Sequence, residues 1–167
     1  MVAPTKKVLI ALAVLGLLGF GAYRLRLFLA SEETRIRWLV ESMADSFNER
    51  DAGDCVAGLA EDFREETVKL GKTEIHPLLV YLFFKEKDPK TGKFPFRIEV
   101  PRESLKVILG PEEGKASLEL LARFHEDRGK GSRLVWEALI TADLLKKDGA
   151  WRVARSTHAP VSGKRPF

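Results

Sequence analysis

Cysteine and histidine are scarce in this sequence. Among 167 residues there are one cysteine, Cys55, and three histidines. A single cysteine cannot form an intrachain disulfide, and three scattered histidines lack the clustered spacing that a zinc site needs. The sequence also has no Gly-x-Gly-x-x-Gly or phosphate-binding loop and no serine nucleophile elbow. We therefore expect no metal and no cofactor, and no catalytic residue can be named from a motif.

Most of the chain carries no excess of positive charge. The formal net charge is +4, from 28 basic and 24 acidic residues. The excess lies entirely in residues 1–30, which contain no acid and the bases Lys6, Lys7, Arg24 and Arg26. The rest of the chain is neutral and has no basic stripe interleaved with aromatic residues. We expect no nucleic-acid partner.

Residues 8–23 form an uncharged apolar run, VLIALAVLGLLGFGAY. As a helix this run spans about 24 Å, and snorkelling arginines extend the span from residue 8 to 30 to about 34 Å. We predict a short basic tail (1–7) and a transmembrane anchor (8–30). A signal peptide cleaved after Gly19-Phe20-Gly21 is the alternative. The basic tail favours a single-pass protein of the inner (cytoplasmic) membrane with an extracytoplasmic domain, whereas Arg24 and Arg26 favour the opposite side.

The chain after the anchor is predicted to be an α+β domain, 31–159, followed by a flexible tail, 160–167. Ser31 is a good N-cap for a first helix that ends near Arg50. A second, shorter helix starts at Asp51 and extends toward Phe63. The third helix covers 73–88. Apolar residues then alternate with a period of two, which predicts five strands: 96–100, 104–109, 116–125, 133–147 and 150–158.

Asp148-Gly149 is a two-residue hairpin signal that sets the register of the last two strands. It pairs Lys147 with Ala150 and places Ala142 opposite Arg155. Cross-strand partners share a face of the sheet. The core face then holds Trp136, Ala138, Ile140, Ala142, Leu144, Trp151, Val153, Arg155 and Thr157. The outer face holds Glu137, Leu139, Thr141, Asp143, Arg152, Ala154, Ser156 and His158.

Between residues 33 and 159 the chain resembles the nuclear transport factor 2-like superfamily, which includes the SnoaL-like proteins. The resemblance rests on the order of the long first helix, Asn48–Asp51, Glu61–Phe63, Gly71–Ile75 and Lys147–Val153. It implies a cone-shaped, cystatin-like roll in which three helices close a curved antiparallel sheet around a pocket, often in a dimer. The superfamily includes enzymes (ketosteroid isomerase, scytalone dehydratase, limonene epoxide hydrolase) and noncatalytic proteins, so the fold leaves the function open.

Arg155 is the most informative candidate for the pocket. An arginine on an apolar face must pair with an acid, reach water at a rim, or bind an anion. The ligand-binding candidates are Arg155, Trp136, Trp151, Phe124, Thr157 and Tyr81. Enzymes of this superfamily need a carboxylate or histidine in the pocket, and the predicted register places none there; only Asp62 and His76 stay open.

These observations favour a membrane-anchored, noncatalytic binding or scaffold domain of the cell envelope. Its apolar pocket would take a small anionic ligand or a protein partner. The domain is also expected to form a homodimer through the outer face around Leu139, Thr141, Ala154 and Ser156. The alternative is a pocket enzyme of the isomerase, dehydratase or hydrolase kind. An acid or histidine lining an apolar cavity would distinguish the enzyme from the binding domain.

Overall fold

The computed structural model describes residues 30–88, 91–128 and 131–166. The predicted basic tail and all but the last residue of the predicted anchor lie outside these ranges. No helix within them is long and apolar enough to cross a membrane. The described elements are, in chain order, α2 (Glu32–Glu49), α3 (Ala52–Ala57), β1 (Leu59–Glu65), β2 (Leu70–Gly71), α4 (Lys72–Lys85), β3 (Phe96–Glu99), the 3₁₀ turn η1 (Arg102–Ser104), β4 (Lys106–Leu109), β5 (Lys115–Arg128), β6 (Gly131–Lys147) and β7 (Ala150–Gly163).

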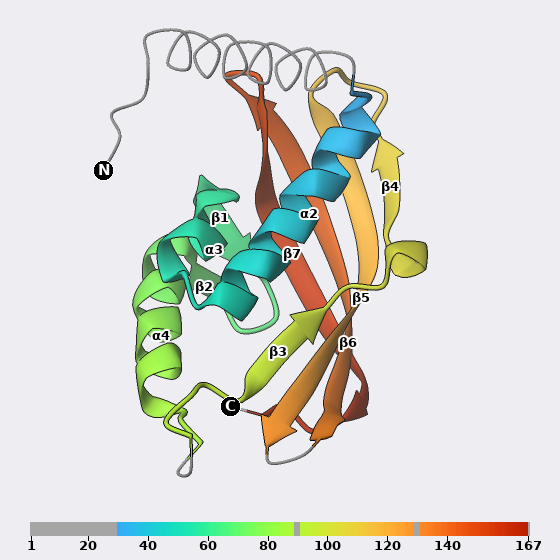
Figure 1. The fold of residues 1–167 in the computed structure, drawn as a ribbon. Helices are drawn as coiled ribbons and strands as arrows, with labels where there is room; N and C mark the ends of the chain where they lie inside the picture. Colours follow the sequence, from blue (N-terminus) through green and yellow to red (C-terminus); the bar gives the residue numbers. More distant parts are fainter. Residues whose placement is uncertain (1–29, 89–90, 129–130, 167) are drawn as a thin grey trace, which may run out of the picture.

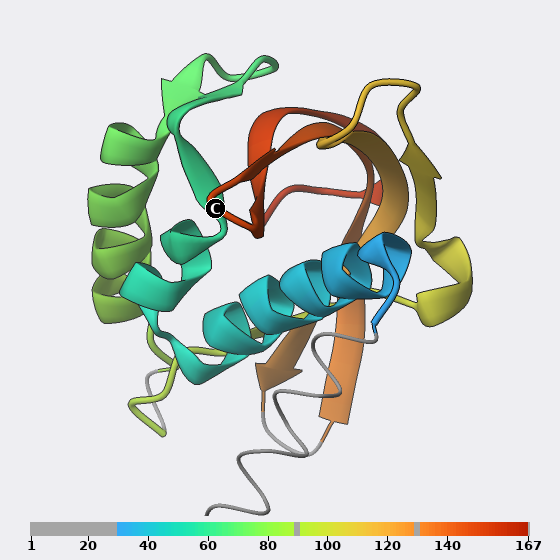
Figure 2. The ribbon, with the colours of Figure 1, turned by 90° about the horizontal axis from the view of Figure 1, so that it is seen from above.

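The strands form one mixed sheet with the order β2-β1-β7-β6-β5-β3, and β4 also pairs with β5. All pairs are antiparallel except β1 with β7, which is parallel. The long strands β5, β6 and β7 bend strongly, and α2 crosses the inner side of the bend, with α3 and α4 beside it (Figures 1 and 2). The predicted α+β class with a curved sheet is confirmed.

Local signals and one polar contact place α2 on the sheet. The Ser31 hydroxyl accepts the amide N–H of Thr34 at the start of the helix, and Arg50 ends it in the left-handed region. Ile36 is completely buried. The side-chain amide of Asn48 donates to the carbonyl of Ile98 at 2.9 Å and accepts its N–H at 2.8 Å. Because both hydrogen bonds are made to the β3 backbone, they fix the end of α2 against that strand.

Two predicted boundaries are wrong. The second helix ends at Ala57, and the residues from Leu59 onward form β1 instead. β1 pairs with β7, which is remote in sequence, so local periodicity could not reveal the strand. The last strand, predicted to end at residue 158, continues to Gly163, past the predicted end of the domain at 159. Its final residues pair with β6, with Ser162 opposite Glu137 and hydrogen-bonded to it at 2.6 Å.

A β-bulge in β7 makes the predicted hairpin register wrong for the residues beyond Val153. Near the turn, Lys147 pairs with Ala150 and Leu144 with Val153, as predicted. The next pair is Asp143 with Arg155, so Ala154 is an extra residue on β7. Because side chains alternate between faces, one extra residue moves every later side chain to the other face. Arg155 and Thr157 therefore lie on the outer face, and Ser156 and His158 on the inner face.

Candidate functional site

A cavity of about 470 Å³ lies between α4 and the inner face of the sheet. α4 contributes Leu78, Leu79 and Tyr81, and the strands contribute Phe124 and Trp136 among others. Most of the lining is apolar, which is typical of a small-molecule site. The polar residues on the sheet side are Glu65 at the end of β1 and Ser156, Thr157 and His158 of β7.

Glu65 and His158 form a hydrogen-bonded pair on the wall of this cavity. The Nδ1 atom of His158 lies 2.9 Å from Oε1 of Glu65. The two side chains are only 20% and 13% exposed. The parallel pairing of β1 with β7 brings them together, because it sets Glu65 beside Ser156. Thr67 also holds β7 in place, because its hydroxyl accepts a hydrogen bond from the backbone N–H of His158 at 3.0 Å.

The surroundings of Glu65 keep it ionised. Burial raises the pKa of its carboxyl, but hydrogen bonds from the Val68 amide, His158 and Thr67 outweigh this effect and hold the pKa below its ordinary value. The Val68 N–H bond to Oε2 is 2.6 Å long. Because a carboxylate can only accept, Nδ1 of His158 carries a hydrogen. In the neutral imidazole, Nε2 is then the basic atom.

The Nε2 atom of His158, a residue of the cavity lining, has no hydrogen-bond partner in the described part of the chain. The indole of Trp136 packs edge-on against the imidazole, with the ring centroids 5.9 Å apart. A histidine oriented by a carboxylate and backed by an apolar wall is an arrangement suited to general acid–base chemistry.

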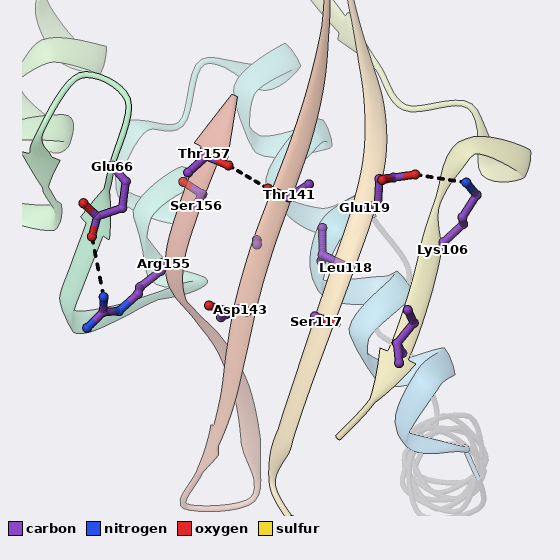
Figure 3. Close-up of a pocket in the computed structure, with 12 residues that line it drawn as sticks. Glu66, Lys106, Ser117, Leu118, Glu119, Thr141, Asp143, Arg155, Ser156 and Thr157 are labelled. Carbon is purple, nitrogen blue, oxygen red and sulfur yellow. Dashed lines mark hydrogen bonds and ion pairs between the residues drawn. The ribbon is translucent and has the colours of Figure 1, made fainter. Parts of the chain in front are cut away.

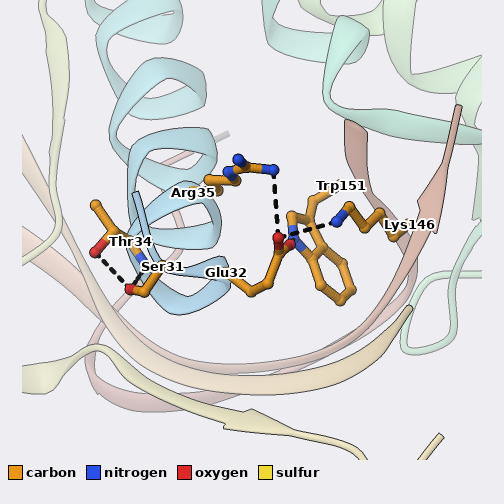
Figure 4. Close-up of polar contacts among 6 residues, drawn as sticks. All are labelled: Ser31, Glu32, Thr34, Arg35, Lys146 and Trp151. Atoms are coloured by element: carbon orange, nitrogen blue, oxygen red, sulfur yellow. Dashed lines mark hydrogen bonds and ion pairs between the residues drawn. The ribbon is translucent and has the colours of Figure 1, made fainter. Parts of the chain in front are cut away.

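The six predicted ligand-binding residues do not all lie at one site in the structure. Phe124, Trp136 and Tyr81 line the α4 cavity, with Tyr81 half exposed on α4. Thr157 borders this cavity, but its hydroxyl is hydrogen-bonded to that of Thr141 on the outer face. Trp151 does not line the cavity. Its indole N–H donates to the carboxylate of Glu32 at 2.7 Å at the start of α2, where Lys146 also binds the same carboxylate (Figure 4). Trp151 therefore joins the last hairpin to α2.

The predicted inward position of Arg155 is wrong, because the bulge turns this residue outward. Its side chain is 69% exposed, and its guanidinium lies 3.8 Å from the Glu66 carboxylate. It lines a groove on the outer face of the sheet, together with Asp143 and the hydrogen-bonded hydroxyls of Thr141 and Thr157 (Figure 3). Arg155 therefore reaches water and pairs with the acid Glu66 on the outer face, and it does not point into the α4 cavity.

Sequence reasoning missed Glu65 and His158, the hydrogen-bonded pair of ionisable side chains on the sheet side of the cavity. It placed His158 outside and gave Glu65 no role. One signal was available: regular alternation put a charge, Arg155, on an apolar face, and a bulge before it removes that conflict. Asp62 and His76, which the sequence left open, are exposed and do not line the cavity. Within the described residues, no cluster of histidine, cysteine and acidic side chains suits a metal ion.

Comparisons with known proteins identify the fold. No family model matches the sequence, and no curated protein matches it significantly. A solved structure of a nuclear transport factor 2-like protein with a cystatin-like fold from Novosphingobium aromaticivorans superposes with a TM-score of 0.63, at 16% identity over 86% of this chain and 89% of that chain. A cystatin-like protein of unknown function from Nostoc punctiforme gives 0.60, at 14% identity over 78% and 91%. A ketosteroid isomerase-like protein from Erwinia carotovora atroseptica gives 0.55, at 16% identity over 80% and 99%.

These likenesses show the fold alone. The resemblance inferred from the segments between 33 and 159 is confirmed at this level: the domain has the nuclear transport factor 2-like, cystatin-like fold. The identities are too low to transfer a reaction or a ligand. The features that bear on function are the cavity and the Glu65–His158 pair on its wall.

Proposed function

We propose that the domain is a pocket enzyme that moves a proton within a small, mainly apolar substrate, with His158 as the general base. The observation that carries the proposal is the 2.9 Å contact between His158 and Glu65 on the wall of the α4 cavity. This is the acid and histidine whose presence separates the enzyme from the noncatalytic alternative. The proposal replaces the anionic ligand expected from Arg155, which points away from the cavity.

The proposed chemistry needs no further reactant. Nε2 of His158 removes a proton from the substrate, and the positive charge that develops on the imidazole is stabilised by the Glu65 carboxylate. The same nitrogen then returns the proton to another atom of the substrate, as in an isomerisation, or to a leaving hydroxyl, as in a dehydration. Phe124 and Trp136 exclude water from the bound substrate and contact its apolar part.

Deuterium exchange tests this proposal directly. The full-length protein is incubated in D₂O with a panel of small cyclic ketones and enones, and incorporation next to the carbonyl is followed by NMR. A positioned general base typically contributes about 10²–10⁴-fold, so His158→Gln should lower the exchange rate by about 100-fold or more. His125→Gln is the matched control, because this histidine lies against Glu99 and outside the cavity. Equal rates in wild type and His158→Gln across the panel would refute the proposal.

A noncatalytic binding domain of an envelope complex is the second candidate. It is favoured by apolar side chains on the outer surface of α4, where Leu78 and Tyr81 are half exposed and Phe84 is 75% exposed. Exposed apolar side chains next to a cavity mouth are typical of a partner contact. Substituting Phe84→Ser should then weaken capture of a partner without changing deuterium exchange.

The membrane anchor at 8–30 belongs to the proposal and rests on the sequence pattern alone. It would hold the domain at the inner membrane, and the basic tail favours an extracytoplasmic domain. Alkaline carbonate extraction of membranes tests the anchor: the full chain should stay in the membrane pellet, and a chain that starts at residue 31 should be released. Release of the full chain as well would remove the anchor from the proposal.

A further inference from the structure

A second cavity, of about 310 Å³, continues from the α4 cavity into the space beneath α2. We call it the inner chamber. Its walls come from α2 through Val40, Met43 and Ala44, and from the sheet through Leu118, Ala122 and Val153. Nearly all of its lining is apolar, whereas the α4 cavity also contacts the charged side chains of Lys85, Glu86 and Arg165. The two spaces therefore differ in what they can hold.

The two cavities share part of their walls. The residues that line both are Glu65, Ile75, Leu79, Phe124, Ile140 and Ser156. Glu65 thus lies on the wall where the two spaces meet, and His158, hydrogen-bonded to Glu65, lines the α4 cavity beside this shared wall.

The inner chamber can accept only apolar groups at low cost. A polar group placed there would lose its hydrogen bonds to water without gaining new ones. The thiol of Cys55 lies on the chamber wall and stays uncharged at neutral pH, because burial, followed by the nearby carboxylates of Asp51 and Asp54, raises its pKa to about 11. It therefore offers no charged group to a ligand. Met43 is flexible and polarisable, so it can adapt to the shape of an alkyl group.

From this arrangement the geometry points to a substrate class: an elongated compound with one polar function, a carbonyl or a hydroxyl, held at His158 and an unbranched alkyl chain buried in the inner chamber. This inference rests on the proposed function, since it assigns the substrate of the same site. The chain supplies binding energy through burial. The polar function supplies the atom on which His158 acts.

A series of 1-alkanols from hexanol to tetradecanol tests the length of the site. Each alkanol competes with the neutral fluorescent probe N-phenyl-1-naphthylamine for the full-length protein. Burial of one methylene contributes about 0.8 kcal/mol, so affinity should rise about fourfold per methylene until the inner chamber is full, and then level off. Ala44→Leu narrows the chamber and should move this plateau to a shorter alkanol.

Two further variants keep the test decisive. Ala122→Leu narrows the chamber from the sheet side, so it replaces Ala44→Leu if that protein fails to fold. Ala57→Leu is the matched control, because Ala57 is exposed on α3 and lines neither cavity. A plateau that shifts in the chamber variants and stays in Ala57→Leu supports the inference. A plateau already reached at hexanol, or one that the chamber variants leave in place, overturns it, as does a failure of every alkanol to displace the probe.

The failure of this inference and that of the proposed function are distinguishable. Chain-length dependence reports on the inner chamber, whereas deuterium exchange in His158→Gln reports on proton transfer. If deuterium exchange depends on His158 while the affinity for alkanols does not depend on their chain length, only the inferred substrate class is wrong.

Discussion

Replacing Glu65 with glutamine exchanges one carboxylate oxygen for an NH₂ group and should invert the tautomer of His158. In the native protein both Glu65 oxygens accept, one from His158 Nδ1 and one from the Val68 amide. Glutamine has one acceptor and must present an N–H to the other partner. The Val68 amide can only donate, but imidazole can move its hydrogen from Nδ1 to Nε2. In Glu65→Gln, Nε2 should therefore become a donor and lose its basic lone pair.

The cost in stability follows from the two hydrogen bonds of Glu65. Hydrogen bonds to a charged group contribute about 1.5–3 kcal/mol each, and neutral ones about 0.5–1.5 kcal/mol. Two bonds change from the first kind to the second, and both side chains are mostly shielded from water. We expect the free energy of unfolding to fall by about 2–3 kcal/mol, since the variant keeps both contacts and only loses their ionic character.

Side-chain ¹⁵N NMR measures the tautomer, and urea denaturation measures the stability. The sequence contains only three histidines, so the His158 signals can be assigned by substituting the other two. Glu61→Gln is the matched control: Glu61 lies on the same strand, is 88% exposed and contacts Lys72. Its effect should stay below about 0.5 kcal/mol. If Glu65→Gln keeps the hydrogen on Nδ1 and unfolds like the control, Glu65 does not orient His158.

Four other outcomes can be measured. Because the folded pKa of Glu65 lies below its ordinary value of 4.5, its contribution is complete above that value and is lost as the pH falls through the folded pKa; acid unfolding followed by circular dichroism should therefore be less steep in Glu65→Gln. Arg155→Ala should change the free energy of unfolding by less than about 0.5 kcal/mol, and a loss of about 3 kcal/mol would instead indicate a buried ion pair. Trp151→Phe should cost about 1–2 kcal/mol in urea denaturation, because the Glu32 carboxylate loses its indole donor. Self-association through the outer face around Thr141 remains a prediction, and sedimentation of a monomer at tens of micromolar, roughly where a modest interface forms, would contradict it.

Much of the architecture could be predicted because its signals are local. Ser31 begins α2 as predicted, and the change from helical to alternating periodicity after residue 88 separates the helices from every strand except β1 and β2. The Asp148-Gly149 turn has both residues in the left-handed region, as a two-residue hairpin needs. The pairs next to it, Lys147 with Ala150 and Leu144 with Val153, follow from the turn alone.

The candidate site could be predicted only in part. Phe124, Trp136 and Tyr81 line the α4 cavity, and their residue types made them candidates. His158 was assigned to the wrong face because the register was counted residue by residue from the turn, and this method does not detect a bulge several residues away. An error of one residue in register exchanges the inside of a strand for its outside.

The sequence by itself determined the start of α2, the long C-terminal strands and the hairpin turn, since capping, periodicity and turn chemistry depend on neighbours in the chain, and the resemblance supplied the curved-sheet fold. Only the tertiary structure decided what lies in the cavity. The extra residue Ala154 leaves the charge of Arg155 in water instead of under α2, where an unpaired charge would be very costly. The same shift turns His158 inward, and the parallel pairing of β1 with β7 brings Glu65 to meet it across 93 residues of sequence. Contacts of that range depend on packing of the whole domain, which no local pattern in the sequence records.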